Sequence, residues 1–270
     1  MPKQPQPATP HPFRVTTSDD KKNAEINEVQ EIADRICNGL AIPDLVAALH
    51  KTKDGRAKSK IAEEFVQLLL TAPPTSAMVK NANAHAVVRH KRDESRGGEE
   101  QKKWEDKIKT LHARLKGGAA KHADEIMTYL HKQRSAHADG CKFVWEMEIK
   151  DIGGPKVQDI EQYGQKIDVY SSENSGVLVE VERGGVLTNN HDFKDIWKCH
   201  LSGARHLILV VPIHNYAKNK TEPRDKPFQE CKKRLKPFFS DPTKHLDIDS
   251  VFLVPYACDE RSLRRAHTPA

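Results

Sequence analysis

Three carboxylates stand close together in the stretch "KIDVYSSENSGVLVEVERGG", residues 166–185, where they interrupt two runs of alternating apolar residues. They are Asp168, Glu180 and Glu182. Three hard oxygen ligands of this kind suit Mg²⁺ or Mn²⁺. The same acids on the solvent face of an ordinary strand pair would have no chemical role. The spacing therefore raises two interpretations, a metal site or an exposed acidic face.

The turn formers in "SENSG" predict that the two runs pair as an antiparallel hairpin with its turn near Asn174. In that register Asp168 lies opposite Glu180, about 5 Å away, and the valines face the core. Like charges directly opposite each other destabilise a sheet unless solvent or a cation relieves them. Because a helix and two apolar strands follow, we expect the hairpin to lie inside a sheet, which favours the cation.

The chain that precedes these acids is expected to be a short tail followed by helices. Residues 1–20 are rich in proline and predict a disordered tail. Apolar residues then recur at helical spacing as far as a Gly117-Gly118 stop, so residues 21–117 are expected to be helical and to add DNA contacts. The expected helices include residues 26–40, 43–51, 59–72 and 76–90, and a stripe of Trp104, Ile108, Leu111 and Leu115.

The pattern changes near residue 118 to helix, three strands, helix, strand, helix, strand. Residues 205–213 and 248–256 are nearly continuous apolar runs, typical of strands buried on both faces. This order predicts a mixed α/β fold, a sheet sandwiched by helices. We expect a catalytic domain over residues 118–260 and a basic tail over residues 261–270.

With its acids on those elements, the chain resembles the PD-(D/E)xK nuclease superfamily, which has the restriction-endonuclease-like fold. The resemblance covers roughly residues 119–256. The family signature places an Asp on the second core strand and a Glu/Asp-x-Lys on the third. Asp168 and Glu180 match the two acids, and Glu182 stands where the lysine is usual, as in some type II restriction enzymes.

The resemblance implies a Mg²⁺- or Mn²⁺-dependent DNA endonuclease, such as a type II restriction enzyme or a related defence nuclease, acting as a homodimer. Asp168 and Glu180 would bind the metal, and Glu182 would bind metal or orient water. The missing positive charge would come from Lys194 or Lys198 on the next helix, unless these are solvated lysines. Glu125 would be a further metal ligand, or a solvent-facing residue of its helix.

The charge distribution favours a polyanionic partner. The chain of 270 residues has a net charge of +6 and a pI near 8.9. Residues 216–237 hold eight Lys or Arg against three Asp or Glu, and the turn at residues 55–60 is a further phosphate-contacting candidate. The residues expected to contact nucleic acid are Lys232, Lys233, Arg234, Arg183 and His191.

Other function classes fit less well. The five cysteines are scattered without a CxxC pair, which favours free thiols in the cytoplasm. No apolar run is long enough for a membrane span, and the first residues lack the apolar core of a signal peptide. A zinc site around His191 fits no usual spacing. Two alternatives to a nuclease remain: a catalytically inactive DNA-binding protein with a nuclease-like site, and, more distantly, a glycoside hydrolase, for which 6% aromatic residues give few sugar platforms.

Overall fold

A computed structural model describes residues 12–16, 23–70, 101–115, 122–133, 143–145, 177–182, 186–187, 189–201, 204–217, 220–240 and 248–262. The chain divides into two compact units. Residues 1–41 together with 138–270 form one, here called the sheet unit, and residues 42–137 form the other, the helical unit.

The sheet unit is built on a five-stranded sheet with the order β1-β7-β4-β3-β2. β2, β3, β4 and β7 run parallel, and β1 is antiparallel to β7. A short antiparallel ribbon of β5 and β6 follows β4. The strand bounds are β1 Phe13–Thr16, β2 Phe143–Trp145, β3 Val177–Val181, β4 His206–Pro212, β5 Asn215–Tyr216, β6 Pro223–Asp225 and β7 Ser250–Tyr256.

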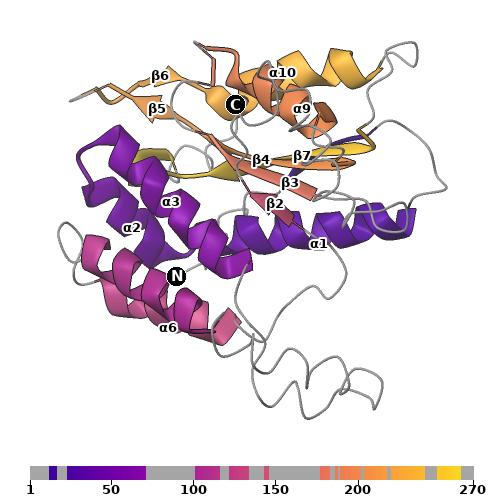
Figure 1. Ribbon diagram of the computed structural model, residues 1–270. Coiled ribbons are helices and arrows are strands. Elements are labelled where there is room, and N and C mark those ends of the chain that lie inside the picture. Colours follow the sequence, from indigo (N-terminus) through magenta and orange to yellow (C-terminus); the bar gives the residue numbers. More distant parts are fainter. Residues whose placement is uncertain are drawn as a thin grey trace, which may run out of the picture. The chain divides into compact units, whose positions relative to one another are not determined.

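Helices cover both faces of this sheet (Figure 1). α1 (Asn23–Leu40) lies along one face and contacts β7. α9 (His191–Leu201) and α10 (Pro227–Ser240) lie on the opposite face. α9 connects β3 to β4, and α10 connects β4 to β7, because parallel neighbours need a crossover rather than a tight turn. The predicted mixed α/β layering is therefore confirmed.

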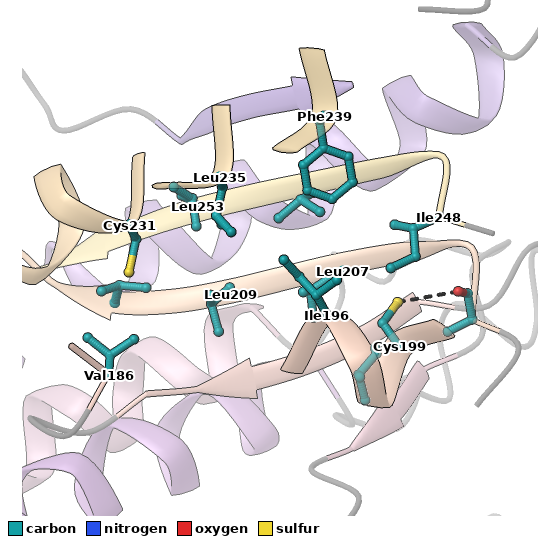
Figure 2. Packing of buried hydrophobic residues seen from close by; sticks show 14 residues of the cluster. Val186, Ile196, Cys199, Leu207, Leu209, Cys231, Leu235, Phe239, Ile248 and Leu253 are labelled. Atoms are coloured by element: carbon teal, nitrogen blue, oxygen red, sulfur yellow. Dashed lines mark hydrogen bonds between the residues drawn. The ribbon is translucent and has the colours of Figure 1, made fainter. Parts of the chain in front are cut away.

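Buried apolar side chains fill the space between the sheet and the helices α9 and α10 (Figure 2). Every residue of β3, β4 and β7 is buried, which confirms the prediction that the apolar runs are strands covered on both faces. The cluster under α9 and α10 includes Ile196, Cys199, Leu235, Leu209 and Leu253. Side chains alternate along β3, so Leu178 joins this cluster while Val177 and Val179 point to the other face.

The helical unit contains α2 (Pro43–Lys51), α3 (Gly55–Leu70), a helix over residues 101–115 and α6 (Ala123–Gln133). The predicted stripe of the third of these helices is buried, from Trp104 to Leu115. The Trp104 Nε1–H donates to the Leu68 carbonyl at 2.9 Å, which fixes that helix against the end of α3. None of the helices in the described part combines the length and apolar character needed to cross a bilayer.

The unit boundaries differ from the predicted ranges 1–20, 21–117 and 118–260. The expected disordered tail contains β1, which extends the sheet beside β7. α1 belongs to the sheet unit because its apolar stripe packs on that sheet. α6 belongs to the helical unit because it packs on α2 and α3. The predicted helix over residues 76–90 lies outside the described residues.

The predicted hairpin is wrong. At Val177–Val179, β3 is paired on one edge with β2 and on the other edge with β4, in both cases in parallel. No edge is left there for an antiparallel strand formed by residues 167–170. Asp168 itself lies outside the described residues, so its expected position opposite Glu180 has no support from this sheet.

The core packing under α10 predicts a contrast between two neighbours on that helix. Leu235 is fully buried, so Leu235→Ala should lower the free energy of unfolding by about 2–5 kcal/mol through lost burial and a cavity. Lys233 is exposed and paired only with Glu230 on the surface, so Lys233→Ala should cost less than about 1 kcal/mol. Urea unfolding of both variants measures the difference, and equal losses would contradict the described packing.

Candidate functional site

Two buried glutamates end strand β3. Glu180 and Glu182 are only 5% and 7% exposed and lie on the face of the sheet that α9 covers. The Glu182 amide donates to the Val210 carbonyl at 2.8 Å, so the backbone stays extended beside β4. The Tyr256 hydroxyl donates to the Glu182 carbonyl at 3.2 Å. Three parallel strands thus hold the two carboxylates in place at the carboxyl edge of the sheet.

Helix α9 places three polar side chains against these glutamates. His191, Asp195 and Lys198 are spaced four and three residues apart, so they lie on one helix face. The Lys198 Nζ lies 3.0 Å from Glu180 Oε1 and 2.9 Å from Asp195 Oδ1. The His191 Nδ1 lies 3.1 Å from Glu182 Oε2. The result is a compact cluster of three carboxyl groups, one ammonium and one imidazole, here called the acid cluster.

The acid cluster changes the protonation of Glu182. Burial, the charge of Asp195, a hydrogen bond with Asp195 and the charge of Glu180 together raise the pKa of Glu182 to about 9, and Lys198 opposes them only in part. Glu182 therefore carries a proton at neutral pH. That proton is needed because two carboxylates cannot hydrogen-bond without one. The Asp195 Oδ2 is buried and has no hydrogen-bond partner among the described residues.

Lys198 keeps its charge. Burial by itself would lower its pKa, but the adjacent carboxylates of Asp195 and Glu180 outweigh burial and raise the pKa above the ordinary value. An ammonium held in this way is a fixed positive charge. It is unsuited to act as a general base, because it does not lose its proton near neutral pH.

The oxygen ligands of the acid cluster suit Mg²⁺ or Mn²⁺ in type, and their summed charge is negative when all three acids ionise. Within the described ranges, however, no group of three or more His, Cys, Asp or Glu side chains is arranged to hold a metal ion. Glu180 and Glu182 supply two carboxylates on one strand face, and the third expected ligand, Asp168, lies outside those ranges. The described residues thus fit part of a ligand set.

A second contact fixes the start of α9. The Arg234 guanidinium, on α10, donates to Asn190 Oδ1 at 2.7 Å and lies 3.3 Å from Asp192 Oδ1. It also stacks over the Phe193 ring at 4.6 Å from the centroid. Asn190 has a positive φ of 52°, a conformation that Asn tolerates better than most residues. Arg234, which was predicted to contact nucleic acid, holds the turn that leads into α9.

The other predicted residues lie in different settings. Lys194 is exposed on α9, whereas Lys198 contacts Glu180. Lys232 Nζ lies 4.1 Å from the centroid of the Phe13 ring, and Lys233 is exposed beside Glu230. Glu125 is exposed on α6 of the helical unit. Arg183 lies outside the described residues.

Sequence reasoning missed Asp195 and named Lys198 only as an alternative to Lys194. A signal for Asp195 is present in the helix phase. Asp192, Asp195 and Cys199 are three and four residues apart and share the buried stripe of α9 with Ile196. Charged residues on the apolar stripe of a helix are costly unless they meet partners inside the protein.

Comparisons with models of protein families, with curated proteins and with solved structures found no match to this chain.

The raised pKa of Glu182 predicts a pH-dependent stability. Between the unfolded pKa near 4.5 and the folded value of about 9, the folded protein binds more protons, so stability falls as pH rises. Glu182→Gln removes this loss. The difference in free energy of unfolding, variant minus wild type, should therefore be larger at pH 9 than at pH 6 by about 3–4 kcal/mol.

The measurement is urea unfolding at the two pH values, with Glu125→Gln on the exposed side of α6 as the matched control. The control should follow the wild type. A Glu182→Gln variant with the wild-type pH dependence would show that Glu182 titrates normally in the folded protein.

Proposed function

We propose that this chain is a divalent-metal-dependent DNA endonuclease of the PD-(D/E)xK type. The observation that carries the proposal is the contact between Glu180 and Lys198, at 3.0 Å, at the buried end of β3. Glu182 stands where the resembled signature has a lysine. A lysine from the next helix contacts Glu180, and in some members of that superfamily the positive group is supplied from this helix.

The arrangement of elements around the site supports the same proposal. β3, α9 and β4 form a parallel strand-helix-strand unit, and the acids lie at the end of its first strand. The resembled core has a third strand with the acidic motif, a helical crossover and a further strand. We accordingly propose a restriction-endonuclease-like core for the sheet unit.

In this proposal Glu180 and Glu182 would hold the metal. When bound, a divalent cation supplies a Lewis acid for the phosphate and lowers the pKa of a coordinated water. Glu182 gives up its proton when its carboxylate becomes a ligand, because ligands must be deprotonated. His191, 3.1 Å from the same carboxylate, lies where it can accept that proton on Nδ1.

Lys198 would act as a fixed charge. Glu180 and Asp195 hold its ammonium from two sides, and its raised pKa keeps it protonated. A positive group at such a position stabilises the negative charge that develops on a phosphate under attack. It would also offset the repulsion between the acid cluster and the DNA backbone.

A catalytically inactive DNA-binding protein is the second candidate. One observation favours it: Lys198 offsets one of the two charges of Glu180 and Asp195, and Glu182 is protonated, so about one net negative charge is left without a metal. Such a protein would bind DNA without cleaving it in Mg²⁺ or Mn²⁺. Exposed cations near α10, including Arg224, Lys226 and Lys233, suit DNA binding in either case.

The decisive prediction concerns Glu180. Glu180→Ala should reduce Mg²⁺-dependent cleavage of plasmid and genomic DNA by at least about 10²-fold, because it removes a central ligand and the partner of Lys198. Diverse DNA is needed since cleavage can require a specific sequence. Glu230→Ala, on the surface of α10, is the matched control and should cleave normally. Undiminished cleavage by Glu180→Ala would exclude the site.

A second prediction separates two lysines on one helix. Lys198→Ala should lower kcat by about 10²-fold or more, because the buried positive charge is lost, and Lys198→Arg should recover part of that loss. Lys194→Ala removes an exposed charge from the same helix and should change kcat little. Thermal unfolding shows whether each variant is folded. The reverse order of effects would assign the role to Lys194.

A further inference from the structure

Positive charge is concentrated where α2 meets α3 in the helical unit. Five Lys or Arg side chains fall within ten residues, Lys51, Lys53, Arg56, Lys58 and Lys60. Lys53, Arg56 and Lys60 are exposed. These three residues are here called the basic turn.

The backbone of the basic turn is held at both ends. Thr52 ends α2, where its amide and its hydroxyl both donate to the Ala48 carbonyl, at 3.1 and 2.9 Å. Asp54 begins α3, where its carboxylate accepts from the amides of Arg56 and Ala57 at 3.3 and 3.1 Å. Two helices are thus joined by the three residues Thr52, Lys53 and Asp54. A turn of this length is compatible with a helix-turn-helix element, and also occurs in αα-hairpins.

Two acids of these helices pair with side chains elsewhere in the helical unit. Asp44 lies 2.9 Å from His122 Nδ1, and Glu64 lies 2.8 Å from the Arg114 guanidinium. Asp54 is occupied with the first amides of α3. Lys53, Arg56 and Lys60 are exposed and outnumber Asp54, so the basic turn presents a net positive charge to a partner.

α3 presents this charge on one face. Its other face is buried through Ile61, Phe65 and Leu68, and helix 101–115 and α6 support it there by the Trp104 hydrogen bond and by stacking of Tyr129 on Phe65. Arg56 and Lys60 lie one turn apart on the exposed side. Gly55 precedes them, and nothing lies within 4 Å of where its Cβ would be, so the approach to this end of α3 is open.

We propose that α2 and α3 form a helix-turn-helix element that binds duplex DNA, with α3 in the major groove and Lys53, Arg56 and Lys60 contacting the DNA. The choice of DNA rests on the proposed nuclease function, but binding needs neither the acid cluster nor a metal. In such elements the first residues of the second helix reach base edges, and neighbouring cations contact phosphates.

The surface around the basic turn favours a duplex over other polyanions. Single strands are bound by exposed aromatic platforms, and membranes by exposed apolar side chains beside the cations. Among the described residues the exposed large hydrophobic side chain is Trp197, which belongs to the sheet unit. The described helical unit thus offers charge and helix shape without the apolar groups that the other two partners require.

The test measures binding of the full-length protein to a fluorescent 30-base-pair duplex in EDTA, where no cleavage occurs. The double variant Arg56→Ala, Lys60→Ala is compared with Lys103→Ala, Lys107→Ala, which removes two exposed charges with the same spacing from helix 101–115. Loss of two phosphate contacts should weaken binding at 0.1 M salt by about tenfold or more. It should also make the slope of log K against log salt shallower by about 2.

The control pair should bind as the wild type does, and thermal unfolding should show both double variants folded. Equal binding by the two double variants, or tighter binding of double-stranded RNA than of DNA, would overturn the proposal. So would a wild-type protein that does not bind the duplex. If binding depends on Arg56 and Lys60 but no DNA is cleaved in Mg²⁺, the nuclease proposal is rejected and the DNA-binding proposal is supported. If DNA is cleaved but the two substitutions do not change binding, the nuclease proposal is supported and the DNA-binding proposal is rejected.

Discussion

A buried ammonium between two carboxylates is the interaction on which the candidate site depends. Lys198 is 15% exposed and contacts Glu180 and Asp195, whose side chains are 6% and 2% exposed. Charges this deep are costly unless their partners are held in place, and removing one partner leaves the others unpaired. The strand pairs on both edges of β3 fix Glu180, and the apolar contacts of Ile196 and Cys199 fix α9. Arg234 holds the turn before α9. The core thus serves to keep one ion triad at short distances.

Beside this ion triad, Glu182 is the group whose protonation can change. With Glu180 and Asp195 already sharing one ammonium, a third ionised carboxylate would add an uncompensated negative charge in a buried place. The folded protein avoids this charge by keeping Glu182 protonated, which its raised pKa expresses. A divalent cation would achieve the same balance by replacing the proton. Protonation of Glu182 and the proposed metal binding would therefore each offset the excess negative charge of the buried carboxylates. Metal binding would release the proton that Glu182 otherwise keeps.

Sequence patterns predicted the parts of the fold that depend on local periodicity. The continuous apolar runs of β4 and β7 and the stripe from Trp104 to Leu115 are buried as predicted. The hairpin failed because turn formers and alternation are local signals, whereas the partners of β3 are set by packing with strands far along the chain. The same limit explains α1, whose apolar stripe predicts burial but does not identify the sheet as its partner.

The candidate site shows a finer limit. Alternation placed Glu180 and Glu182 on one face of β3, but the lysine that reaches Glu180 depends on the rotation of α9 relative to the sheet. Lys194 and Lys198 are one helical turn apart and share a sequence neighbourhood, yet one is exposed and the other paired. The buried stripe through Asp195 and Cys199 distinguishes them, because Lys198 borders that stripe and Lys194 does not. Charged residues on a buried helix stripe are a better guide to the site than alternation along the strand, because a buried charge is stable only with partners inside the protein.

Charge is also divided between the two units, and the proposed function requires such a division. An acid cluster repels the phosphate that it would cut, and at physiological salt this repulsion extends over roughly 8 Å. Attraction must then come from cations that do not neutralise the cluster itself. The net charge of +6 is consistent with this, since cations outnumber acids while three acids are gathered beside one lysine. On the proposed function, the basic turn would supply affinity and the acid cluster would supply chemistry. Affinity and chemistry would then depend on different residues, so a substitution could change one without the other.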